Sequence, residues 1–183
     1  LGRNIGVTDD NLTPELFPSD EEKQSASRRL VSKGINPSEA IIGINPSSGG
    51  SVPNWTPRRY IELIQSLAER YQIVINISKK DVEIEKVLAP ILRPGIATDS
   101  GEIRELISLC AGMDVLVSSS TGTMHIAAAL GIPTVSLFCP LTACSPQLWG
   151  PLGNRAEVIL PGPNYCQIQC PKDPKICPLE EIG

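Results

Sequence analysis

The segment from Val115 to Pro133, VLVSSSTGTMHIAAALGIP, combines small hydroxyl residues, a glycine and the only histidine of the chain. The pattern predicts a buried strand, a short turn and the opening of a helix. The first N–H groups of a helix lack partners within it, and with the helix dipole they attract anions, phosphates above all. The candidate phosphate-binding residues are Ser120, Thr121, Gly122, Thr123 and His125.

A second loop of this kind, PSSGG, follows the apolar run AIIGIN. Its glycines allow a ligand to approach the backbone closely, and the hydroxyls of Ser47 and Ser48 can donate to phosphate oxygens. Each loop alone has a plain structural explanation, a capped helix start for the first and a flexible surface loop for the second. Two such loops at strand–helix junctions of one sheet favour a phosphorylated ligand.

Three of the cysteines, Cys166, Cys170 and Cys177, have a spacing that loosely suggests a metal site. A tetrahedral zinc site needs four ligands, however, and no histidine or C-x-x-C pair lies nearby. We therefore expect free thiols and no bound metal. Nucleophilic hydrolysis is poorly supported, because the chain has no G-x-S-x-G motif.

Short apolar runs alternate with helical patterns along the chain. Strands are predicted at residues 40–45, 72–77, 114–117, 133–138 and 155–160, and helices at residues 20–32, 57–68, 81–88, 101–110 and 122–130. This alternation is typical of a Rossmann-like α/β fold, a parallel sheet with helices on both faces. We predict a linker and a helix in residues 1–35 and a nucleotide-binding domain in residues 36–183.

The composition excludes several classes of protein. A net charge of −4 argues against a nucleic-acid-binding surface, and no apolar run is long enough for a transmembrane helix. The opening has no signal-peptide pattern, and the cysteine usage fits a reducing compartment, so we expect a cytoplasmic protein. Because the sequence starts at Leu1, a piece of a longer chain is expected.

The string STGTMHIAAALGIPTVSLFCP resembles the signature of bacterial ADP-heptose:lipopolysaccharide heptosyltransferases, glycosyltransferase family nine. The segment INPSSGGSVPNWTPRRYIELIQSL, the triplet Trp149-Gly150-Pro151 and the tail from Cys177 to Ile182 are also similar to this family. The resemblance implies the C-terminal, donor-binding half of a two-domain GT-B enzyme. In the family the other half supplies the acceptor site and the catalytic aspartate, so no catalytic residue is expected here.

The resemblance also implies roles for individual residues. Ser47 and Ser48 match hydroxyl residues near the donor diphosphate, and His125 matches the motif histidine. The implied helix-terminal amides belong to Thr121, Gly122 and Thr123, and the implied nucleoside contacts are Asp81 or Glu83 at the ribose and Gly101 and Glu102 near the adenine. No metal is implied, since the chain has no Asp-x-Asp motif.

Three positions depart from the family pattern. Pro53 stands where the family has lysine, Ser120 where it has aspartate and Cys139 where it has glycine. The first two positions ordinarily touch the donor, so the identity of the donor stays open. Arg58 or Arg59 is a candidate replacement for the lysine.

The implied function is transfer of heptose or a related sugar from a nucleotide-diphosphate sugar to the lipopolysaccharide core. A lipid-linked saccharide would be the acceptor, bound by the absent half, and this fragment alone should be inactive. A second expected location of the protein is the inner face of the membrane, to which it would bind as a peripheral protein. The alternatives are a nucleotide-sugar-binding module without transfer activity and a GT-B-like nucleotide-sugar epimerase.

Overall fold

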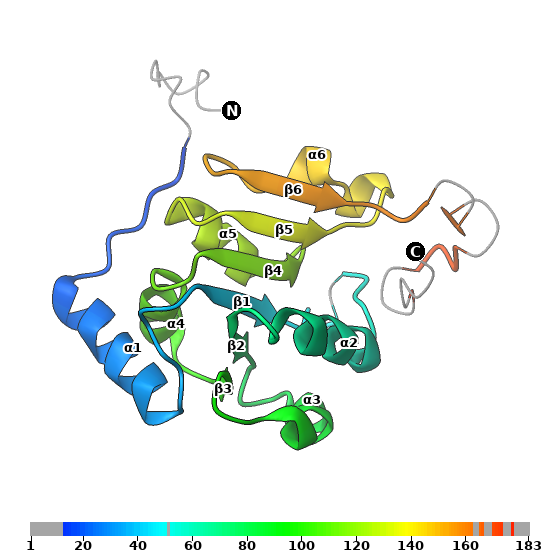
Figure 1. Ribbon diagram of the computed structural model, residues 1–183. Coiled ribbons are helices and arrows are strands. Elements are labelled where there is room, and N and C mark those ends of the chain that lie inside the picture. Colours follow the sequence, from blue (N-terminus) through cyan, green and yellow to red (C-terminus); the bar gives the residue numbers. More distant parts are fainter. Residues whose placement is uncertain (1–12, 51, 163–164, 167–169, 174–176, 178–183) are drawn as a thin grey trace, which may run out of the picture.

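A six-stranded parallel sheet forms the centre of the computed structural model, which describes residues 13–50, 52–162, 165–166, 170–173 and 177. The strand order is β3-β2-β1-β4-β5-β6 (Figure 1), the order of a Rossmann-like α/β domain. The predicted fold class is thus confirmed. The strands are β1 (Ile41–Asn45), β2 (Gln72–Asn76), β3 (Ile96–Asp99), β4 (Val115–Ser119), β5 (Thr134–Leu137) and β6 (Ala156–Ile159).

The helices begin close to the predicted residues. They are α1 (Asp20–Ser32), α2 (Pro57–Leu67), α3 (Val82–Leu88), α4 (Ile103–Cys110), α5 (Gly122–Ala129) and the short α6 (Pro146–Trp149), with 3-10 turns η2 (Ala89–Ile91) and η3 (Thr142–Cys144). Ser19 caps α1, and its Oγ accepts from the N–H of Glu22 at 3.2 Å. Thr56 occupies the predicted cap position of α2, but among the described residues its side chain makes no capping hydrogen bond.

Among the strands of the described part of the chain, β3 is the one that the sequence patterns do not predict. It has only four residues, and two of them, Thr98 and Asp99, are polar. A turn through Gly95, whose φ is +87°, turns the chain into the strand. Pairing with β2, in the register Ile73↔Ile96, then fixes β3 at the edge of the sheet.

Most of the core lies in two clusters, one on each face of the sheet, because successive strand residues point to opposite faces. Val74 of β2 belongs to one cluster and its neighbours Ile73 and Ile75 to the other. The first cluster includes Leu30 of α1, Leu109 of α4 and Ala127 of α5, and the second includes Ile64 of α2 and Leu88 of α3.

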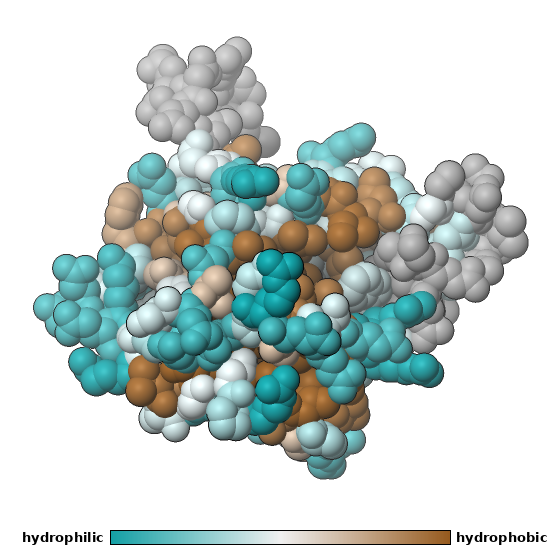
Figure 2. All heavy atoms as spheres, viewed as in Figure 1, coloured by the Kyte–Doolittle hydropathy of each residue, from teal (hydrophilic) through white to brown (hydrophobic). Residues whose placement is uncertain are grey.

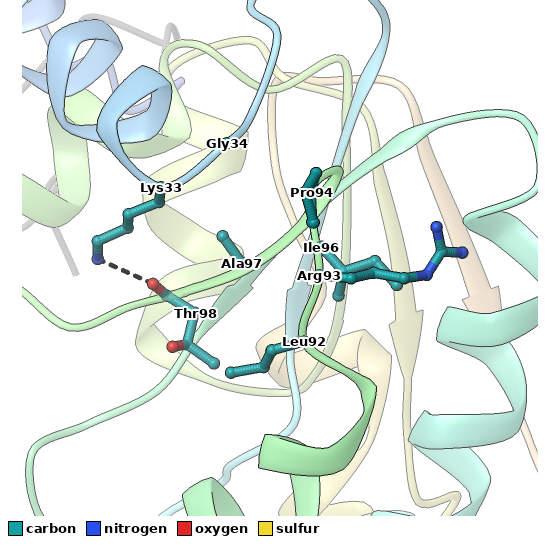
Figure 3. Close-up of a pocket in the computed structure, with 8 residues that line it drawn as sticks. All are labelled: Lys33, Gly34, Leu92, Arg93, Pro94, Ile96, Ala97 and Thr98. Carbon is teal, nitrogen blue, oxygen red and sulfur yellow. Dashed lines mark hydrogen bonds between the residues drawn. The ribbon is translucent and has the colours of Figure 1, made fainter.

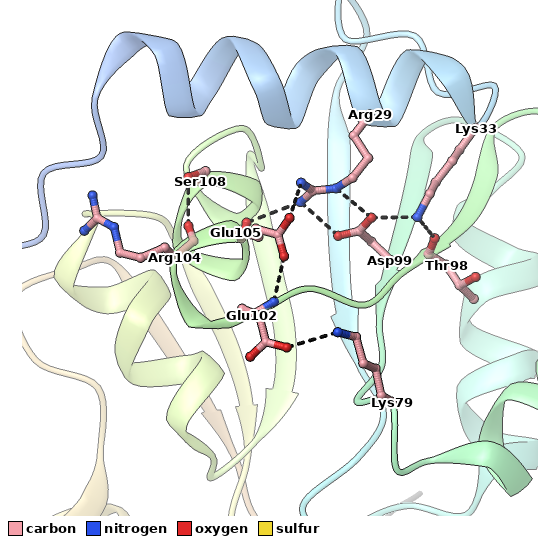
Figure 4. A network of polar contacts seen from close by, with 9 residues as sticks. All are labelled: Arg29, Lys33, Lys79, Thr98, Asp99, Glu102, Arg104, Glu105 and Ser108. Carbon is pink, nitrogen blue, oxygen red and sulfur yellow. Dashed lines mark hydrogen bonds and ion pairs between the residues drawn. The ribbon is translucent and has the colours of Figure 1, made fainter.

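Helix α1 is attached to the sheet by ion pairs (Figure 4). Asp99, at the end of β3, is only 2% exposed and accepts from Arg29 Nε at 3.0 Å and Lys33 Nζ at 2.6 Å. Glu22 of α1 also pairs with Arg104 of α4 at 2.7 Å. The helix predicted for residues 1–35 therefore packs onto the domain predicted for residues 36–183, although the boundary between them stays a prediction.

The surface is hydrophilic around α1, whereas hydrophobic side chains gather over β5 and β6 in the upper part of Figure 2. Exposed apolar residues of this region include Val158 and Leu160 around β6 and Leu148 of α6. None of the helices in the described part of the chain is long and apolar enough to cross a membrane. The first twelve residues of the predicted linker and the family-like tail after Cys177 lie outside the described residues.

Candidate functional site

The two predicted phosphate-binding loops lie side by side. Strands β1 and β4 are neighbours, with Asn45 opposite Ser118 at their carboxyl ends. From β1 the chain continues to β2 on one side, and from β4 to β5 on the other side. The loops after β1 and β4 thus flank the topological switch point of the sheet, where ligands of such folds bind.

A cleft of about 480 Å³ opens above this point, a volume suited to a small-molecule ligand. Ser47, Ser48 and Gly49 line it from the loop after β1, and Thr121 and Thr123 line it from the start of α5. The far end is lined by the predicted nucleoside residues Asp81, Gly101 and Glu102. Residues predicted for the diphosphate and for the nucleoside therefore share one cleft.

Asn45, which the sequence motifs do not single out, holds the floor of the cleft together. Its side chain is buried, and its Nδ2 donates to the carbonyl oxygen of Ser47 at 2.8 Å. Its Oδ1 accepts from Asn76 Nδ2 at 2.8 Å and from Thr123 Oγ1 at 3.3 Å. One amide thus links β1, β2 and α5. The sequence signal that could have identified Asn45 is an asparagine at the end of each of two apolar strands, IIGIN and QIVIN.

The start of α5 is not capped by its own N-cap side chain. Thr121 occupies the cap position without a capping hydrogen bond, and its Oγ1 lies 2.9 Å from Ser118 Oγ instead. No described residue accepts a hydrogen bond from the backbone N–H of Gly122 or Thr123. These two donors are available to an anion, which is what a phosphate-binding helix start requires.

A second cavity of about 380 Å³ adjoins the cleft, and Thr121 lines both. The second cavity, but not the cleft, is also lined by Ser120, Gly122 and His125. The predicted residues around α5 are therefore divided between two spaces. The rest of the second cavity is lined by Val52, Ala143, Cys144 and Trp149.

Of the two carboxylates proposed for the ribose, only one lies in the cleft. Asp81 lines it, and its Oδ2 accepts from the N–H of Ser78 at 2.9 Å. Glu83 is exposed on α3, pairs with Lys86 at 2.8 Å and lines neither cavity. The geometry favours Asp81 for a contact with the ligand.

The positive charge of the cleft comes from lysines that the sequence analysis does not identify. Lys79 and Lys80 line the cleft, whereas Arg58 and Arg59 pair with Glu62 at 3.1 and 3.5 Å and line neither cavity. Lys79 Nζ lies 3.0 Å from Glu102 Oε1 (Figure 4), and this hydrogen bond raises the pKa of Lys79. Lys79 is therefore fully charged at neutral pH.

The loop after β1 is held by Asn54, in its own C-terminal part, and by Tyr60 of α2. Asn54 Nδ2 donates to the carbonyl oxygen of Pro46 at 2.6 Å, and Asn54 Oδ1 accepts from the hydroxyl of Tyr60 at 2.7 Å. Tyr60 is fully buried, and burial raises its pKa. Pro53, at the position of the family lysine, is itself buried in this loop and presents no charge.

A larger groove of about 550 Å³ runs along edge strand β3 (Figure 3). Its walls are aliphatic side chains and backbone, together with Lys33 and Arg93. Lys33 already donates to the carbonyl oxygen of Thr98 at 2.8 Å and to Asp99. The groove holds none of the predicted ligand-binding residues, so it is not the candidate site.

Two of the tail cysteines, Cys166 and Cys177, lie near Cys139 in the loop after β5. Burial raises the pKa of the Cys139 thiol, and the nearby thiols of Cys144, Cys166 and Cys177 act in the same direction. Within the described residues, no three His, Cys, Asp or Glu side chains are grouped closely enough to hold a metal ion.

Comparisons with known proteins identify the family of this chain. The sequence profile of glycosyltransferase family 9 (heptosyltransferase) matches residues 4–178. Lipopolysaccharide heptosyltransferase 2 of Escherichia coli K12 is 31% identical over 156 residues, which cover 81% of this chain and 43% of the relative. Lipooligosaccharide heptosyltransferase 2 of Haemophilus influenzae is 29% identical over 164 residues, 85% of this chain and 46% of the relative.

Two solved structures share the fold. The structure of Escherichia coli ADP-heptose lps heptosyltransferase II superimposes with a TM-score of 0.69 at 29% identity, covering 84% of this chain and 47% of the other. A family 9 glycosyl transferase from Veillonella parvula gives a TM-score of 0.77 at 20% identity, covering 91% and 48%. The chain spans about half the length of the proteins it matches. Because the family profile covers nearly all of it, the chain belongs to glycosyltransferase family 9, the heptosyltransferase family.

Proposed function

We propose that this chain binds a nucleotide-diphosphate sugar as the donor-binding part of a lipopolysaccharide heptosyltransferase. The observation that carries the proposal is the meeting of two Ser/Thr/Gly loops at the switch point of the sheet, above a cleft that continues to Asp81 and Glu102. The names of the relatives support the reaction, transfer of heptose or a related sugar to the lipopolysaccharide core.

In the proposed complex, the donor diphosphate lies on the start of α5. The N–H groups of Gly122 and Thr123 donate to phosphate oxygens, and the dipole of α5 favours the negative charge. The nucleoside extends into the cleft, where Asp81 accepts hydrogen bonds from ribose hydroxyls and Glu102 lies near the base. Lys80, which lines the same cleft, adds positive charge to it, whereas Lys79 is paired with Glu102 on the nucleoside side.

The proposed chemistry is an inverting single displacement at the anomeric carbon of the sugar. As the bond to the sugar breaks, negative charge grows on the leaving diphosphate, and the preorganised donors of α5 stabilise it. We propose that the base and the acceptor site lie outside residues 1–183, because the chain spans less than half of its curated relatives. The donor would be used at the cytoplasmic face of the membrane, without a metal ion.

A nucleotide-sugar-binding module without transfer activity is the second candidate. It is favoured by the loss of two donor-contacting residues of the family pattern, since Pro53 is buried and uncharged and Ser120 has no carboxylate. A nucleotide-sugar epimerase is less well supported, because the cleft and the second cavity offer one histidine and few carboxylates as acid or base groups.

Calorimetric titration with ADP, UDP and GDP tests the proposal and identifies the nucleotide. The decisive variant is Gly122→Ala, because a Cβ at this position meets no heavy atom within 4 Å, so the fold tolerates it. A methyl group there would stand against a diphosphate on the helix start and should weaken nucleotide binding about tenfold or more. Gly122→Asp adds a negative charge at the same point and should abolish binding.

The matched control is Gly162→Ala, at a second glycine whose Cβ would meet nothing within 4 Å, and which lines neither cavity. Both alanine variants should unfold at the wild-type temperature, and only Gly122→Ala should lose affinity. Unchanged affinity in folded Gly122→Ala would mean that the Ser/Thr/Gly turn is merely a helix start. The purified chain should also show no turnover with ADP-heptose and a core acceptor; turnover would place the base within this chain.

A further inference from the structure

The second cavity has a lining that differs from that of the nucleotide cleft. Its residues come from three segments, the loop after β1, the start of α5 and the segment after β5. Among the residues that the structure describes, this lining includes no lysine, arginine, aspartate or glutamate, whereas the neighbouring cleft has four such residues. The second cavity is therefore suited to an uncharged group attached to the diphosphate, rather than to a further phosphate.

The cavity is polar on one wall and apolar on the other. Ser120 and His125 offer hydrogen-bonding groups beside the start of α5, while Val52, Ala143 and Trp149 present carbon surface. A sugar ring has the same division, with hydroxyl groups around its edge and C–H groups on its faces. A lining of this kind can bind the hydroxyls by hydrogen bonds and cover one face of the ring.

Trp149 has the geometry of a preorganised platform. It ends α6, and its indole Nε1 donates to the carbonyl oxygen of Ala143 at 2.9 Å. This bond satisfies the polar atom of the indole and limits the motion of the side chain. The residue is nevertheless 53% exposed, so much of its aromatic surface is not used in the packing of the domain. An ordered, exposed aromatic side chain beside a cavity binds a ligand at low entropic cost.

We propose that Trp149 is the sugar-recognition residue of this chain, with one face of the donor sugar stacked on its indole and the sugar hydroxyls directed to Ser120 and His125. This inference rests on the proposed function, because it requires a nucleotide-diphosphate sugar with its diphosphate at Thr121 and Gly122. Thr121 lines both cavities, so a ligand that crosses it has its nucleoside in the cleft and its sugar in the second cavity.

The test compares ADP with ADP-heptose by calorimetry. Wild type should bind ADP-heptose more tightly than ADP, and Trp149→Ala should weaken ADP-heptose binding about tenfold while leaving ADP affinity unchanged. Trp149→Phe should restore most of the lost affinity, because it keeps an aromatic face. Leu148→Ala is the matched control, since Leu148 is exposed on the same helix and does not line the cavity. It should bind both ligands like wild type.

Fluorescence provides an independent measurement. The chain has two tryptophans, and in a Trp55→Phe background the tryptophan emission comes from Trp149 alone. ADP-heptose should then change the emission of Trp149, whereas ADP should leave it unchanged. If Trp149→Ala affects ADP and ADP-heptose equally, or affects neither, the inference is wrong while the proposed nucleotide site stands. If wild type binds neither ligand, the proposed function and the inference fail together.

Discussion

Replacing Asn45 by alanine removes few atoms but should destabilise the domain strongly. The variant loses the donor to the Ser47 carbonyl oxygen and the acceptor of Asn76 Nδ2, both at 2.8 Å, and the weaker bond from Thr123 at 3.3 Å. Each lost bond costs about 1 kcal/mol, and the buried amide of Asn76 that is left without its acceptor costs roughly another 1 kcal/mol. The expected loss is about 3–4 kcal/mol in the free energy of unfolding.

Urea unfolding followed by circular dichroism measures this loss, and the slope of the transition should not change. Asn36→Ala is the matched control, because Asn36 is exposed and the hydrogen bonds of its side chain are local, to Glu39 and Ser38. A destabilisation of Asn45→Ala below about 1 kcal/mol, or equal to that of Asn36→Ala, would refute the assignment of Asn45 as the link between the strands and α5.

Asn45→Asp separates the structural role from the role in binding. The carboxylate keeps an acceptor for Asn76 and Thr123, but it places an oxygen against the Ser47 carbonyl oxygen, where the amide donated at 2.8 Å. It also adds a negative charge at the floor of the proposed diphosphate site. ADP affinity should therefore fall further in Asn45→Asp than in Asn45→Ala, although Asn45→Asp is the smaller change in shape. The opposite order would contradict a phosphate above Asn45.

Further predictions concern α1, the thiols and zinc. Asp99→Asn should lower the free energy of unfolding by about 2–3 kcal/mol, measured by urea unfolding. Asp99 is only 2% exposed, but its partners Arg29 and Lys33 are 25% and 35% exposed, so the loss should be moderate. A loss no larger than that of Asp20→Asn, whose pair with Lys23 is exposed, would contradict this prediction. Burial raises the pKa of Cys110 from 9.0 to about 12, so the unfolded chain releases this thiol proton first and stability should fall as the pH rises above 9.0. Cys110→Ala should make that alkaline decline shallower, since Tyr60 and Cys139 still contribute to it, and an unchanged decline would refute the assignment. Elemental analysis should find no structural zinc, and about one zinc per chain, lost only with unfolding, would show the opposite.

The sequence by itself determined the class of the fold and the positions of most elements. Each of the five predicted strands is a short segment of mainly apolar residues, and each predicted helix begins near a Ser, Thr, Asp, Gly or Pro signal, so local composition was sufficient. Strand β3 was missed because Ile96 and Ala97 are its only apolar residues, and its extended form depends on pairing with β2. The two candidate loops were also recognisable, because small hydroxyl residues and glycines at strand ends form a local pattern.

Only the tertiary structure decided which residues meet. The strand order brings β1 beside β4, whose pairing residues Asn45 and Ser118 are 73 positions apart in the chain, and no local pattern encodes such a contact. The same order places Lys79 and Asp81 in the cleft and leaves Glu83, two residues beyond Asp81, outside it on α3. Trp149 joins the second cavity because the segment after β5 folds back towards the start of α5. Side-chain identity is local, whereas a binding site depends on how distant segments pack, and that packing is set by the sheet as a whole.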